Sequence, residues 1–128
     1  MRYLLKAVAT CGFLGIMLLV SDRHVAVGAG TVELGNKLYQ ARCAACHGSD
    51  GKAATPTAQA LAPKPRDHTD GVYMNQLTPE HLVKVIKNGG TAVGKSPIMP
   101  ANSDLNDQQI EDIAAFVRSL AVPPYSVK

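Results

Sequence analysis

Two cysteines and a histidine lie within five consecutive positions of the stretch ARCAACHGSDG, residues 41–51. Cys43 and Cys46 have the Cys-x-x-Cys spacing, and His47 follows directly. Three chemistries use this arrangement: thiol–disulfide exchange, a zinc site, and covalent attachment of a c-type haem. The rest of the chain has to indicate which of them applies.

The first two chemistries each lack a part in this sequence. A thiol-exchange motif is expected beside a strand–helix crossover, and no alternating or β-branched run predicts a sheet. A structural zinc site needs four ligands in a tetrahedron. Cys46 and His47 are adjacent and cannot easily turn to one ion together, and only the scattered His68 and His81 remain. Thiol exchange and zinc binding both stay open as alternatives, although the sequence lacks a part that each of them needs.

Haem attachment uses all three residues. Each thiol adds to one vinyl group of the haem, and the three-residue step places both sulfurs on one side of a helical turn. The small residues between the cysteines leave room for a flat macrocycle against the backbone. We therefore predict one haem c, bound covalently through Cys43 and Cys46, with His47 as an axial ligand of the iron.

A single axial histidine leaves the sixth position of the iron open, and its occupant distinguishes electron transfer from ligand binding. Pro97 and Pro100 restrict the backbone on either side of Met99, so this loop can hold a thioether in place. We predict Met99 as the second axial ligand. The other possible donors are interpreted as an apolar gap-filler, Met74, and as solvated polar residues, His68 and His81.

Further partners of the haem are expected around these ligands. The second ring nitrogen of an axial histidine normally has an acceptor, and the carbonyl of Pro56 is our candidate. Arg66 is a candidate for binding a haem propionate through its planar guanidinium, with assistance from Lys95 or Tyr73.

Three helices are predicted to position these residues. The first covers residues 32–42 and contains Gly35, a poor helix former that either costs about 1 kcal/mol without benefit or allows the close approach of another helix. The second begins after the N-cap Thr78 and ends at the glycine pair 89–90. The third has a capping box of Asn106 with Gln109 and stops after Ala121. Between the first two helices, some thirty-five residues show no regular period and are expected to wrap around something.

Residues 1–29 are interpreted as a signal peptide, because two early positive charges precede the apolar run of residues 7–20, and Val27 and Ala29 fit a cleavage site before Gly30. The alternative is an uncleaved membrane anchor, although the run is shorter than the roughly 20 residues of a membrane span. The predicted domain covers residues 30–128, and the expected location is periplasmic, with possible membrane association.

Charge and composition limit the functional classes. The whole chain has 13 basic and 10 acidic residues, and removal of residues 1–29 leaves 10 and 9, a net charge of +1. This balance indicates no nucleic-acid partner. The predicted domain has no Trp and a single Phe, Phe116. Its core is therefore thin for about 99 residues, and a bound group is expected to fill the middle.

The segments GNKLYQARCAACHG, SPIMP and LNDQQIEDIAAFVRSL, in this order, resemble a small bacterial class I c-type cytochrome with one His/Met-ligated haem. The resemblance implies an all-α fold in which the first and last helices cross near the haem edge, with Gly35, Tyr39 and Phe116 at the crossing. It also implies a proline carbonyl bonded to the proximal histidine. The lack of a Trp near the propionates departs from much of the group.

The expected function is electron transfer, as a periplasmic carrier or as an electron-transfer subunit of a respiratory complex, and not enzymatic catalysis. The expected partners are redox proteins, whose identity the sequence does not indicate. The alternative is a haem protein that binds or activates a peroxide or diatomic gas at an open or displaceable sixth position.

Overall fold

A computed structural model describes residues 31–126 of the chain, so the predicted signal peptide or anchor lies outside the described residues. The elements in chain order are α1 (Val32–Arg42), α2 (Ala44–His47), α3 (Pro56–Ala60), α4 (Gly71–Met74), α5 (Pro79–Asn88), the 3₁₀-helix η1 (Gly90–Val93) and α6 (Asp107–Ser119). Within the described range the fold is all-α, as predicted, with one isolated β-bridge between Asp70 and Val122. None of these helices has the length and apolar character to cross a membrane.

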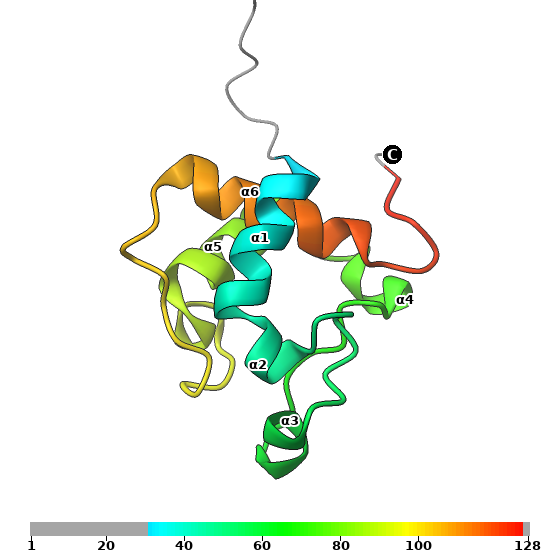
Figure 1. The fold of residues 1–128 in the computed structure, drawn as a ribbon, viewed down its shortest axis with the longest axis vertical. Coiled ribbons are helices and arrows are strands. Elements are labelled where there is room, and N and C mark those ends of the chain that lie inside the picture. The colour runs from blue at the N-terminus through cyan, green and yellow to red at the C-terminus, as the bar shows by residue number, and fades with distance from the viewer. Residues whose placement is uncertain (1–30, 127–128) are drawn as a thin grey trace, which may run out of the picture.

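The first and last helices cross each other, as Figure 1 shows for α1 and α6. Gly35 makes the crossing possible, because a Cβ at this position would overlap the carbonyl oxygen of Asp112. Next to it, the rings of Tyr39 and Phe116 pack with their centroids 4.9 Å apart. The predicted crossing and its three residues are therefore confirmed.

Local capping explains where the other two long helices begin. The Thr78 side chain accepts a hydrogen bond from the backbone N–H of His81 at the start of α5. Asn106 and Gln109 form the predicted reciprocal capping box at the start of α6. Both starts agree with the prediction, and Gly89, at φ 79°, ends α5.

The segment between α1 and α5 differs from the prediction in having three short helices. Thr55 accepts from the backbone N–H of Ala58 in α3, and Asp70 accepts from that of Tyr73 in α4. Helices of four or five residues are too short for an apolar period to show in the sequence. Single side-chain caps mark the starts of α3 and α4, whereas α2 has no side-chain cap. Figure 1 shows α3 and α4 apart from each other, with α3 at the bottom of the view and α4 beside the C-terminal end of α6.

The core lies where α1, α5 and α6 face one another. Its largest fully buried side chains are Tyr39, Met74, Ile110 and Ile113. Met74 is 1% exposed and packs in this cluster, which agrees with its interpretation as a gap-filler. The core thus draws on all three long helices and on α4.

We expect Gly35→Ala to lower the free energy of unfolding, because the added methyl group meets the backbone of α6, which cannot rotate away. Overpacking typically costs about 1–3 kcal/mol, more than the roughly 1 kcal/mol of helix propensity gained on replacing Gly by Ala. Guanidinium unfolding of the purified protein measures the change. Asn36→Ala, on the exposed face of the same helix, is the control. Equal stability of Gly35→Ala and the wild type would contradict the crossing as the tight contact.

Candidate haem site

A cavity of about 600 Å³ lies inside the fold, within the range of roughly 300–1,000 Å³ common for small-molecule and cofactor sites. Its wall is built by α1, α2, α4, α5, α6 and the loops that follow α3 and η1. All four predicted site residues line it: Cys43, Cys46, His47 and Met99. The fold therefore brings residues 52 positions apart in the sequence to one cavity.

The two cysteines belong to one helical turn at the end of α1. The backbone N–H of Cys43 donates to the carbonyl of Tyr39, and that of His47 donates to the carbonyl of Cys43 at 2.9 Å. Both thiols are half-buried, and neither forms a disulfide. Burial, opposed in part by the positive charge of Arg42, raises the pKa of the Cys43 thiol to about 11. Both thiols thus reach the cavity wall in their free form.

The ring of His47 is held by a backbone carbonyl, but not by the predicted one. Its Nδ1 lies 2.9 Å from the carbonyl oxygen of Arg66, whereas Pro56 is the exposed first residue of α3. The prediction of Pro56 is therefore wrong. The partner comes instead from the loop after α3, a long-range contact with no local signature in the sequence. Because a carbonyl only accepts, Nδ1 of His47 carries the proton and its Nε2 keeps a free lone pair.

Burial lowers the pKa of His47, and the hydrogen bond to the Arg66 carbonyl opposes this shift in part. The imidazole is only 9% exposed. Neutral imidazole is the form that binds a metal ion. At neutral pH the ring is therefore ready to donate its Nε2 lone pair to iron without first losing a proton.

His68 is buried, against the prediction of a solvated residue, and it lies beside the candidate ligand. Its ring stacks on that of His47 with centroids 4.2 Å apart and planes 16° apart, and its Nδ1 lies 3.2 Å from the Tyr39 hydroxyl. Burial, followed by the positive charge of His47, lowers the pKa of His68 to about 3. His81 is half-buried and also lines the cavity.

Arg66 and Tyr73 stand together at the cavity wall. The guanidinium carbon of Arg66 lies 3.8 Å from the centroid of the Tyr73 ring, a cation–π contact. Lys95 lines the cavity as well. These three residues are the ones predicted near the propionates, and that role stays a prediction.

The loop that carries Met99 is fixed to the end of α5 by a glycine pair. The backbone N–H of Gly90 donates to the Met99 carbonyl at 3.0 Å, and the Gly90 carbonyl accepts from Lys95 at 2.8 Å. A Cβ at Gly90 would overlap the carbonyl oxygen of Ser96. The sequence predicts only a helix stop at this pair, whereas in the structure the pair also holds the methionine loop in place.

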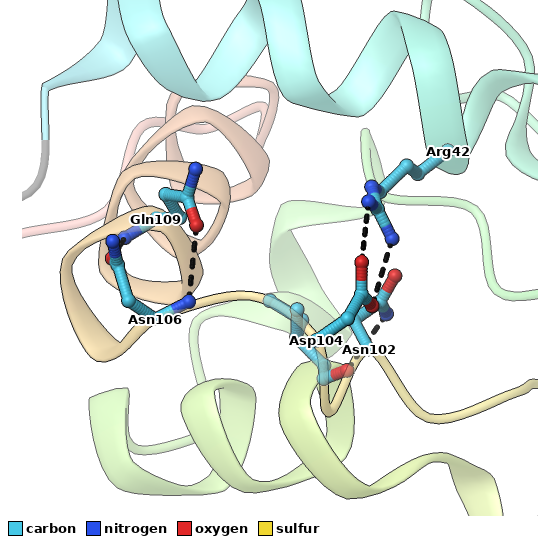
Figure 2. A network of polar contacts seen from close by, with 6 residues as sticks. Arg42, Asn102, Asp104, Asn106 and Gln109 are labelled. Atoms are coloured by element: carbon cyan, nitrogen blue, oxygen red, sulfur yellow. Dashed lines mark hydrogen bonds and ion pairs between the residues drawn. The ribbon is translucent and has the colours of Figure 1, made fainter.

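Two further contacts tie the segment after Met99 to the helices (Figure 2). The Asn102 side chain donates to the carbonyl of Ile86 at 2.8 Å, which links it to α5. Asp104 accepts two hydrogen bonds from the guanidinium of Arg42, at 3.0 and 2.7 Å, which links it to the end of α1 next to Cys43. This contact with Arg42 holds the pKa of Asp104 below its usual range. The methionine loop is thereby fixed relative to the cysteine turn.

The residues of the cavity suit a haem. Aliphatic side chains form much of the wall, two thiols at the attachment spacing reach it, and an imidazole nitrogen and a thioether are available as axial donors. Among residues 31–126, no group of three or more His, Cys, Asp or Glu side chains is placed to hold a metal ion. The donor set therefore fits haem c better than a tetrahedral zinc site.

The family model described as cytochrome c matches residues 32–121. A cytochrome c6 from Cyanidium caldarium is 32% identical over 104 residues, which cover 80% of this chain and 83% of the relative. A thiosulfate dehydrogenase from Allochromatium vinosum is 36% identical over 88 residues, which cover 65% of this chain but only 29% of the relative.

A solved structure supports the fold alone. One chain of the Kuenenia stuttgartiensis reducing HAO-like protein complex superposes with a TM-score of 0.61 at 24% identity. The match covers 71% of this chain and 43% of that one. The likeness to it is therefore one of architecture.

Removal of the attachment cysteines should unfold the protein. In Cys43→Ala with Cys46→Ala, no haem is held in the cavity of about 600 Å³, and the apolar side chains of its wall lose their packing partner. We expect weak helical circular dichroism and no cooperative melting. Cys43→Ala alone, which retains one thioether bond, is the comparison. A sharp thermal transition in the haem-free double variant would contradict this.

Proposed function

Because the chain belongs to the cytochrome c family and carries haem c on Cys43 and Cys46, we propose that His47 and Met99 are its axial ligands and keep it a closed, one-electron carrier. The observation that carries the proposal is the cavity whose wall holds both donors together with both thiols. When bound, the haem supplies the Fe(III)/Fe(II) couple. A thioether donor favours the reduced state and raises the potential.

The protein's own residues then have three tasks. The Arg66 carbonyl holds the proton on Nδ1 of His47 and leaves Nε2 for the iron. Gly90 and Asn102 fix the backbone around Met99, so its thioether is presented in one place. The aliphatic side chains of Leu82 and Ile86, both buried, exclude water from the interior. A site closed in this way needs no substrate pocket.

At the rim, we propose that Arg66 binds a haem propionate, with assistance from Lys95 or Tyr73. The cation–π contact with Tyr73 leaves the edge of the guanidinium available for hydrogen bonds. Arg66 would thus serve the haem twice, through its carbonyl at His47 and through its side chain at the rim.

The partners proposed here are redox proteins that dock transiently near the haem edge, with the protein acting either as a free carrier or as a subunit of a larger complex. The cytochrome c6 relative matches almost the whole domain, which supports the carrier. The subunit stays the alternative, because the likeness to one chain of a multi-protein complex is one of architecture alone. Release from native membranes by high salt would identify a bound subunit, and recovery in the soluble fraction at low salt would identify a carrier.

Met99→Ala should abolish the weak long-wavelength absorption band that a methionine sulfur gives with ferric iron, and it should lower the reduction potential. Visible spectroscopy of the oxidised protein at neutral pH and a redox titration measure both effects. Met74→Leu is the matched control, because it removes a thioether that lies buried in the core. Loss of the band in Met74→Leu, or its retention in Met99→Ala, would contradict the ligand assignment.

The wild type and Met99→Ala also test the competing function, binding of a peroxide or diatomic gas. A closed site predicts that carbon monoxide leaves the spectrum of the reduced wild type unchanged but alters that of Met99→Ala. Rapid binding by the wild type would instead favour an open or displaceable sixth position, with the protein acting on small ligands.

We further propose that the chain is exported to the periplasm and cleaved before Gly30. An intact mass of the protein purified from its native host should match residues 30–128 plus one haem. A mass that includes residues 1–29 would favour a retained anchor, and a mass without haem would contradict covalent attachment.

A further inference from the structure

Four rings form a continuous series from the helix crossing to the candidate iron ligand. The Phe116 ring of α6 packs on Tyr39 of α1, with centroids 4.9 Å apart. Tyr39 meets His68 edge-on at 5.8 Å, and His68 stacks on His47 at 4.2 Å. Aromatic pairs at such separations contribute about 0.5–1.5 kcal/mol each beyond their buried area. The series thus links the tightest packing of the fold to the imidazole at the cavity.

His68, the third ring of this series, is held by both its backbone and its side chain. Its backbone N–H donates to the Gly51 carbonyl at 2.8 Å, and its Nδ1 lies 3.2 Å from the Tyr39 hydroxyl. Gly51 has no room for a side chain, because a Cβ there would lie 2.7 Å from Leu120 and 3.3 Å from the Cβ of His68. The ring is 9% exposed. It therefore has little freedom to move without disturbing its neighbours.

The backbone contact of His47 does not by itself prevent its imidazole ring from tilting. The Arg66 carbonyl holds Nδ1 but forms a single hydrogen bond, about which the imidazole can still tilt. The stacked face of His68, only 16° from parallel, blocks that tilt from one side. The plane of an axial imidazole determines its π-overlap with the iron and the distribution of unpaired spin over the haem.

From these contacts we propose that His68 is a positioning residue for the axial histidine: held by the Tyr39 hydroxyl and the Gly51 carbonyl, its ring fixes the plane of the His47 imidazole. The inference rests on the proposed function, in which His47 binds the iron. It adds a side-chain support, from the loop between α3 and α4, to the backbone support that Arg66 provides.

The test uses the haem-loaded protein and three substitutions. His68→Ala removes the stacked face, His68→Phe keeps a flat ring without the nitrogen, and Tyr39→Phe keeps the packing but removes the hydroxyl. Tyr125→Phe is the control, because this tyrosine stacks on Arg118 and does not line the cavity. Proton NMR of the oxidised protein records the haem-methyl shifts, and a redox titration records the potential.

We expect His68→Ala to change the order or spread of the haem-methyl shifts and to displace the potential. His68→Phe should return both toward the wild type, Tyr39→Phe should give a smaller change, and Tyr125→Phe should give none. Wild-type methyl shifts and potential in His68→Ala, with only a lower melting temperature, would overturn the proposal. If that variant does not mature, unchanged shifts and potential in Tyr39→Phe would overturn it equally.

NMR spectra of the wild type test the premise, iron binding by His47, separately from the positioning role of His68. Strongly shifted ring-proton signals of an axial imidazole, lost in His47→Ala, establish the ligand. Their absence would refute the proposed function itself, whereas their presence together with unaffected His68 variants would refute only the positioning role.

Discussion

The contact on which the rest of the structure depends is the crossing of α1 and α6 at Gly35. Because this residue has no side chain, the backbone of Asp112 approaches α1 directly, and Tyr39 and Phe116 then meet ring against ring. The next turns of α1 lead into Cys43, so the crossing also determines where the attachment turn begins. Close packing of backbones thus fixes the direction in which the thiols enter the cavity.

The cavity in turn explains how a domain with one Phe and no Trp forms a stable interior. Buried side chains of α1, α4, α5 and α6 surround a space that they do not fill, and haem c supplies the missing apolar surface. Binding and folding are therefore coupled, because the group that performs the chemistry also completes the core. Such a protein gains its stability when the cofactor is attached rather than before.

Features encoded by neighbouring residues could be predicted from the sequence itself, and the long-range crossing of α1 and α6 was implied by the family resemblance. The other contacts between distant residues could not be predicted. The capping box of Asn106 and the N-cap Thr78 satisfy backbone groups within four residues, so their signals are local. The carbonyl that holds His47 lies nineteen residues away in an irregular loop, where any residue offers the same group. No local sequence pattern predicts the burial of His68 either, because it depends on Tyr39, a partner twenty-nine residues away.

The loop that carries the Arg66 carbonyl and the loop that carries Met99 are held in place by different contacts. The loop bearing the Arg66 carbonyl and His68 is anchored to the ring of His47, to Gly51 and to Tyr39. The methionine loop depends on Gly90, on the half-buried hydrogen bond of Asn102 to α5 and on the exposed contacts of Asp104 with Arg42. Regions held by few, solvent-exposed contacts open at lower free energy than a packed core. We therefore expect the methionine side of the cavity to open at lower free energy than the histidine side, whose contacts lie deeper in the fold.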